Sequence, residues 1–241
     1  MFFTFGLVAA FGLVLWLLNL AFYKMVGKGA RKICYITGCI GTPVHEIGHA
    51  IFCVLFRHKI TAIKLYQIGD DGTLGYVNHR YNRRNPYHQI GNFFIGIGPI
   101  ILGSLVILGL MFMFVPRLFH ELGDERGIWR IVYVFFTSAT LDDWRFWVFI
   151  IPAISIALHM SLSIPDIKGS AGGFGFIAVI WLIVDLIVVC FGMDAMYGFT
   201  DGCMNLSYFI VNFLMISIVL TAAMVVITMI IKDIAKLFQR G

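Results

Sequence analysis

Long runs of apolar residues dominate the chain and predict helices that cross a membrane. Six segments show this pattern, at about residues 2–23, 33–57, 90–115, 144–164, 174–192 and 207–231. A run of roughly 18 or more apolar residues, wound as a helix, matches the thickness of bilayer hydrocarbon. We therefore expect an all-α polytopic membrane protein with about six transmembrane helices.

The polar stretch between the second and third runs has a different pattern. Residues 60–66 and 73–77 are rich in β-branched and aromatic side chains, and the sequence Gly69-Asp-Asp-Gly72 lies between them. Such residues around an Asp-Gly turn predict a small β hairpin. The free edge of a hairpin can pair with an extended peptide.

Composition and charge narrow the class of protein. Of the 241 residues, 60% are hydrophobic and 13% are charged, which is more apolar surface than a soluble core can absorb. The net charge of +5 comes from basic residues scattered through short loops. This distribution suits lipid headgroups and argues against a nucleic-acid partner. The five cysteines form no CxxC pair, so no disulfide framework or zinc ribbon is expected.

Basic residues in the loops predict the orientation. The stretch 57–84 carries six Lys and Arg side chains, and Lys232 and Lys236 lie in the C-terminal tail. The rule that cytoplasmic loops are rich in Lys and Arg places both stretches, and hence both termini, in the cytoplasm. The basic residues of 24–32 would then lie on the opposite side, against the rule.

The sequence His45-Glu46-Ile-Gly-His49 carries the strongest chemical signal. Residues four apart share one face of a helix, so both imidazoles can bind one zinc ion with Glu46 beside its open position. Such a site hydrolyses bonds through an activated water molecule whose proton Glu46 accepts and passes on. His45 lies about twelve residues from either end of its run, well below the membrane surface. Ionisable groups at that depth indicate function, whereas the structural alternative is a set of polar side chains that satisfy one another.

Two residues just before this motif predict a break in the helix. Threonine is a good N-cap and proline fits the first turn, so Thr42-Pro43 predicts that the ligand helix begins or kinks there. A break at that depth requires surrounding protein or water.

Three features in order resemble the site-2 protease family of intramembrane zinc metalloproteases. The first is His45 to His49, the second is the basic hairpin loop that leads into Gly96-Ile-Gly-Pro-Ile100, and the third is the aspartate in Leu162-Ser-Ile-Pro-Asp-Ile-Lys-Gly169. The resemblance implies that Asp166 is the third zinc ligand. His159 lies seven residues earlier on a similar helical face and is the rival third ligand.

The resemblance covers residues 33–170. Within this range the sequence differs from the family pattern at several positions, which indicates a divergent branch. Ser163 stands near the place of the family's asparagine before proline, and glycine follows Asp166 by three positions instead of one. Asn92 precedes the Gly-Pro segment, whereas the family has asparagine after it. The residue that stabilises the oxyanion is therefore unassigned.

These observations predict one transmembrane domain, residues 1–241. It comprises an N-terminal span and loop at 1–32, a metalloprotease-like core at 33–170 and a C-terminal helix pair at 171–241. We expect one Zn²⁺ per chain, although iron or cobalt suits the same ligands. The candidate substrate-binding residues are Thr73, Leu74, Gly75 and Asn92.

The expected activity is that of an intramembrane zinc metalloendopeptidase in a bacterial cytoplasmic membrane. Its partners would be the lipid bilayer and a membrane-embedded or membrane-anchored peptide substrate, held by the hairpin at 60–77. One alternative is a peptidase that trims short hydrophobic peptides. Another is a catalytically silent relative that binds membrane proteins.

Overall fold

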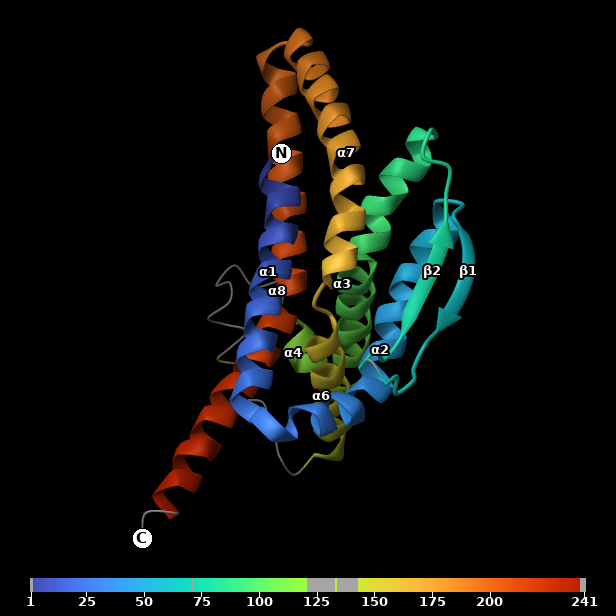
Figure 1. Ribbon diagram of the computed structural model, residues 1–241. Coiled ribbons are helices and arrows are strands. Elements are labelled where there is room, and N and C mark those ends of the chain that lie inside the picture. The colour runs from blue at the N-terminus through green and yellow to red at the C-terminus, as the bar shows by residue number, and fades with distance from the viewer. Residues whose placement is uncertain (1, 71, 121–132, 134–142, 239–241) are drawn as a thin grey trace.

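The computed structural model describes residues 2–70, 72–120, 133 and 143–238, and most of them are helical (Figure 1). A two-stranded hairpin lies at one side of the helices. The helices are α1 (Phe2–Val26), α2 (Ala30–Leu55), α3 (Pro86–Phe114), α4 (Pro116–His120), α6 (Trp144–His159), α7 (Ile164–Cys190) and α8 (Met193–Phe238). A short 3₁₀ turn, η1 (Gly27–Gly29), joins α1 to α2.

Within the part of the chain that the structure describes, four stretches of helix are long and apolar enough to cross a membrane. They are Ala10–Leu55, which includes most of α1 and all of α2, and Pro86–Phe114, Ile164–Cys190 and Leu214–Ile234. Helix α6 has only 16 residues, or about 24 Å, which is less than the roughly 30 Å of bilayer hydrocarbon. The predicted all-helical membrane protein with a small hairpin is thus confirmed.

Helix α7 starts ten residues earlier than the sequence pattern predicts. Ser163 caps its first turn, and Pro165 occupies an early position where its missing N–H costs nothing. Asp166, expected in a loop after the preceding span, therefore lies in the first turn of α7.

Helix α2 is apolar outside and polar inside, the reverse of a soluble helix. Five of its exposed apolar side chains follow one stripe, namely Ile36, Ile40, Ile47, Ile51 and Val54. Its buried residues are small or polar, and they are Gly38, Gly41, Thr42, Glu46, Gly48, His49 and Cys53. This arrangement fits a helix with lipid on one side and a polar interior on the other. The predicted helix start at Thr42-Pro43 is wrong, because α2 is continuous from Ala30 to Leu55 with Pro43 inside it.

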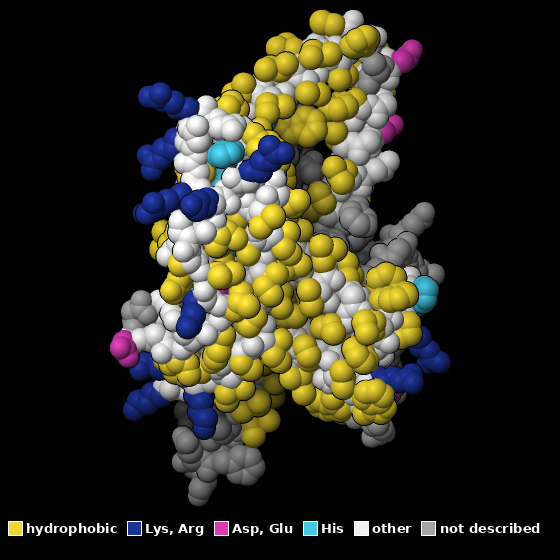
Figure 2. Space-filling model, turned by 90° about the vertical axis from the view of Figure 1, so that its right-hand side faces the viewer, with side chains coloured by type: hydrophobic (Ala, Val, Ile, Leu, Met, Phe, Trp, Pro, Cys, Tyr) yellow, Lys and Arg dark blue, Asp and Glu magenta, His cyan; other side chains and the backbone are white. Residues whose placement is uncertain are grey.

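The hairpin folds back along α2 (Figure 1). Strands β1 (Lys59–Lys64) and β2 (Tyr76–Arg80) are antiparallel. Near the turn, the Tyr66 hydroxyl donates a hydrogen bond of 2.8 Å to the carbonyl of Tyr35, close to the start of α2. Figure 2 shows this face, where apolar side chains predominate and Lys and Arg gather along one side. The hairpin therefore lies beside α2 over most of the length of that helix.

A cluster of histidines fixes the base of the hairpin. His58 Nε2 donates to the carbonyl of His88 at 3.0 Å, and its Nδ1 accepts from His79 Nδ1 at 3.0 Å. The ring of Tyr81 stacks on His58 with centroids 4.9 Å apart. Burial lowers the pKa of His58 to about 4 and also lowers the pKa of His79, so both rings are neutral at pH 7. The position of His58 in a polar loop of the sequence suggests a solvated side chain, but in the structure this side chain is buried.

Candidate metal centre

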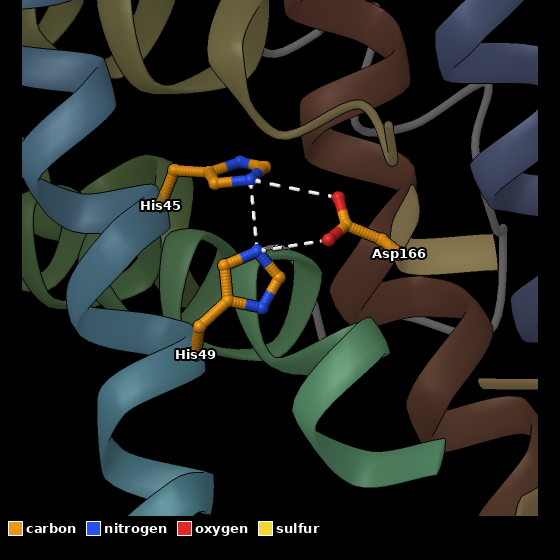
Figure 3. Close-up of side chains that lie close together, drawn as sticks. All are labelled: His45, His49 and Asp166. Carbon is orange, nitrogen blue, oxygen red and sulfur yellow. Dashed lines mark hydrogen bonds and ion pairs between the residues drawn. The ribbon is translucent and has the colours of Figure 1, made fainter. Parts of the chain in front are cut away.

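Three side chains from two helices converge on one point inside the helical part of the protein (Figure 3). His45 and His49 lie one turn apart on α2, and Asp166 lies in the first turn of α7. The two Nε2 atoms are 3.1 Å apart, His49 Nε2 is 3.3 Å from Asp166 Oδ1, and His45 Nε2 is 3.9 Å from Asp166 Oδ2. In a tetrahedral zinc site with bonds of about 2.0–2.1 Å, neighbouring ligand atoms are about 3.3 Å apart. The spacing therefore fits a zinc ion.

The hydrogen bonds at the far side of each ring determine which atoms face this point. His45 Nδ1 donates to the carbonyl of His159 and His49 Nδ1 donates to the carbonyl of Ile95, each at 2.7 Å. Because a carbonyl only accepts, both Nδ1 atoms carry hydrogen, and in neutral rings both Nε2 atoms are acceptors. Two ring nitrogens and a carboxylate thus meet without a donor among them. A proton on one ring satisfies only part of this set, whereas a divalent cation satisfies all three.

The carbonyls of Ile95 and His159 can accept these bonds because neither has a hydrogen-bond partner within its own helix. The Ile95 carbonyl would normally accept from the N–H four residues later, but residue 99 is proline and has no N–H. His159 is the last residue of α6, so its carbonyl has no partner within the helix. A proline in one helix and the end of another therefore orient the two imidazoles.

Ser163 holds the carboxylate of Asp166. Its backbone N–H and its hydroxyl both donate to Asp166 Oδ2, at 2.8 and 2.6 Å, and its Oγ accepts from the Asp166 N–H at 3.3 Å. These contacts form a capping box at the start of α7. The same contacts that begin the helix aim the acid at the histidines.

Glycines bring the supporting helices close enough to α2. A Cβ at Gly48 would lie 2.8 Å from the backbone of Gly98, and a Cβ at Gly41 would overlap the carbonyl oxygen of Ser155. At Gly96 a Cβ would overlap the hydroxyl of Ser170 in α7. The contacts of α2 with α3 and α6, and of α3 with α7, therefore depend on missing side chains.

No protein-family model, curated protein or solved structure matches the chain.

A cavity of about 260 Å³ lies beside the candidate ligands. It is lined by Tyr23, Cys34, Thr42, His45, Glu46, Leu74, Gly75, Leu158, His159 and Ser161. Glu46 is 6% exposed and lies one turn after Thr42 on the same face of α2. The hairpin forms one wall, since a Cβ at Gly75 would lie 2.8 Å from Glu46 Cγ. A carboxylate thus faces a space large enough for water and part of a peptide.

The structure brings only some of the predicted substrate-binding residues to the cavity. Leu74 and Gly75 line the cavity, whereas Thr73 and Asn92, which is buried in α3, are not among its lining residues. The ring of His159 lies in the cavity but outside the three-residue group, because its Nδ1 donates to the Ser155 carbonyl and its Nε2 is 3.8 Å from Cys34 Sγ.

Sequence reasoning missed the supporting roles of Ile95, Pro99 and Ser163. The available signal for Ile95 and Pro99 was their spacing, because a proline four residues after a helical residue leaves the carbonyl of that residue without its usual partner.

Replacing Pro99 with Ala should weaken zinc binding by about 10- to 100-fold, the usual cost of losing a hydrogen-bond partner of a metal ligand. The new N–H at residue 99 would compete with His49 for the Ile95 carbonyl. Competition with a chelating dye on purified protein measures this affinity. Pro152→Ala is the matched control, because the carbonyl that it would engage belongs to Val148, about three turns before His159. Equal affinities for wild type and Pro99→Ala would contradict the role of Pro99.

Proposed function

We propose that the protein is an intramembrane zinc metalloendopeptidase that hydrolyses peptide bonds in or near the bilayer. The observation that carries this proposal is the convergence of His45, His49 and Asp166 beside the buried carboxylate of Glu46. Two histidines and one acid are a common ligand set of zinc peptidases. Because α2 bears an exposed apolar stripe opposite these residues, the chemistry would take place next to lipid.

His45, His49 and Asp166 would hold the ion, and Ser163 and the carbonyls of Ile95 and His159 would keep them oriented. A zinc ion bound there would polarise the scissile carbonyl and acidify a water molecule.

The carboxylate of Glu46 accepts the proton of the attacking water as oxygen adds to the carbonyl carbon. When the C–N bond breaks, the same carboxyl gives that proton to the leaving nitrogen. Its position in the cavity wall suits both steps.

The hairpin supplies a surface for an extended substrate. A helical peptide must unwind before attack, because its backbone is shielded and its carbonyls are hydrogen-bonded. The segment Leu74–Gly75 passes directly over Glu46 and Thr42, so a peptide paired with this backbone would have its carbonyls near the cavity.

Removal and return of the metal test the proposal. Protein reconstituted in liposomes with a membrane-anchored peptide should cleave it, and a zinc chelator should lower the rate by at least about 100-fold. Adding back zinc should restore cleavage, and mass spectrometry of the fragments should find the cut within or beside the membrane segment. Cleavage that continues after the metal is removed would contradict a metallopeptidase.

The same fragments separate the proposal from its alternatives. A trimming peptidase would degrade short free hydrophobic peptides faster than an anchored span. A silent relative would bind the peptide and leave it intact with zinc present.

A further inference from the structure

Five exposed basic side chains lie where the base of the hairpin meets the end of α2 and the start of α3. This basic cluster consists of Arg57, Lys59, Arg80, Arg83 and Arg84. In the upper part of Figure 2, Lys and Arg side chains follow one side of the molecule with no acidic side chain among them. Among the described residues, no member of the cluster forms a salt bridge with an acid. Five positive charges therefore lie together without a counter-charge from the protein.

The strand register places two of these charges directly opposite each other. Lys59 pairs with Arg80, and both side chains are exposed. The next pair, Ile60 and His79, is half-buried, so Lys59 and Arg80 share the solvent face of the hairpin. Like charges opposite each other destabilise an antiparallel pair. An anion bound between the two side chains would replace this repulsion with attraction.

Arg57 occupies a backbone position that favours glycine. It follows Phe56, the C-cap of α2, and has a φ angle of 57°. Its N–H donates to the carbonyl of Val54 at 3.1 Å, which closes the last turn of the helix. Glycine usually fills this left-handed position after a helix, because a side chain there is strained. A guanidinium kept at such a position points to a use for its charge.

The exposed apolar stripe of α2 leads directly to Arg57. Ile51 and Val54 belong to the stripe, and Arg57 follows Val54 by three residues. Val54 is 68% exposed and its neighbour Leu55 is 56% exposed, so apolar surface continues to the edge of the basic cluster. The exposed ring of Tyr87 lies at the same level, since its hydroxyl donates to the carbonyl of Leu55 at 2.7 Å. Tyrosine is enriched where a membrane meets water. An apolar stripe that ends in cations matches the acyl chain and phosphate of a phospholipid.

We propose that the basic cluster binds the headgroup of an anionic phospholipid whose acyl chains lie along the exposed stripe of α2. The headgroup phosphate supplies the counter-charge that Arg57, Lys59 and Arg80 lack, through charge-assisted hydrogen bonds. The bound phosphate also stabilises the base of the hairpin, because it offsets the repulsion between Lys59 and Arg80. This binding does not require the proposed peptidase activity.

Titration of the purified full chain with phosphatidylglycerol or phosphatidylcholine, followed by native mass spectrometry, tests the proposal. Wild type should bind phosphatidylglycerol at least about 10-fold more tightly than phosphatidylcholine. The double variant Lys59→Gln with Arg80→Gln should weaken phosphatidylglycerol binding by about 30-fold, since each basic residue near an anionic headgroup contributes about fivefold. Arg57→Gly should weaken it by about fivefold and raise the melting temperature of the lipid-free protein by about 2 °C, because glycine relieves the backbone strain.

Two controls separate this site from a general attraction between charges. Lys28→Gln with Lys32→Gln removes the same charge from exposed residues at the other end of α2 and should change phosphatidylglycerol affinity less than twofold. Equal losses in the two double variants would overturn the proposal, as would equal affinities of wild type for the two lipids. Inorganic phosphate is the second control. If it raises the melting temperature as much as phosphatidylglycerol does, the acyl chains take no part and the lipid proposal fails.

Discussion

Replacing Glu46 with Gln should lower peptide cleavage by about 10³-fold while the protein keeps its fold and its zinc. The reason is that an amide of nearly the same shape cannot accept the proton of the attacking water or return it to the leaving nitrogen. Glu46 lies in the cavity wall and outside the converging ligand group, so zinc binding should be retained. Cleavage of an anchored peptide in liposomes and zinc content by mass spectrometry provide the two measurements.

Asp185→Asn is the matched control for Glu46→Gln. This change also removes a carboxylate from a membrane helix, but Asp185 lies 19 residues after Asp166 on α7, or about 28 Å along the helix. The Asp185→Asn variant should cleave the peptide at the wild-type rate. Undiminished turnover in Glu46→Gln would refute the role of Glu46 as the base.

Replacing Asp166 with Ala should remove zinc, whereas replacing His159 with Ala should not. Asp166 supplies one of three converging ligand atoms, so its loss should weaken zinc binding by at least about 100-fold, more than a supporting contact costs. His159 orients His45 through its backbone carbonyl, which an alanine at 159 retains. Zinc content after dialysis measures both variants.

The two variants also decide between the two candidates for the third ligand. If zinc is lost from His159→Ala and kept in Asp166→Ala, then the ring of His159 is the ligand and the geometry in Figure 3 is not that of the metal-bound protein.

The parts of the site that could be predicted from sequence follow local periodicity. Helices follow from the length of apolar runs, and His45 and His49 share a face because they are four residues apart. Asp166 is 117 residues from His49, and no local pattern links them. It could be proposed only through the family resemblance, because contacts between distant helices depend on packing. The hairpin illustrates the same limit, since its pairing was predicted from its turn residues and its position along α2 was not.

Pro43 and Pro99 illustrate a second limit. Thr42-Pro43 predicts that a helix begins or kinks there, yet α2 continues through Pro43, and Pro99 likewise lies inside α3. A proline removes one hydrogen bond, and a helix tolerates that loss when another group uses the freed carbonyl. At Pro99 this group is the imidazole of His49. Whether a proline interrupts a helix thus depends on a neighbouring group that the linear sequence does not identify.

The exposed isoleucine stripe of α2 sets the distance between the proposed chemistry and the surrounding acyl chains. The helix that carries His45, Glu46 and His49 is itself an outer wall of the protein, and an α-helix is about 10 Å across. A peptide that diffuses sideways in the membrane need pass around only one helix to reach the carboxylate. The composition and thickness of the annular lipid should therefore change the rate of the proposed cleavage.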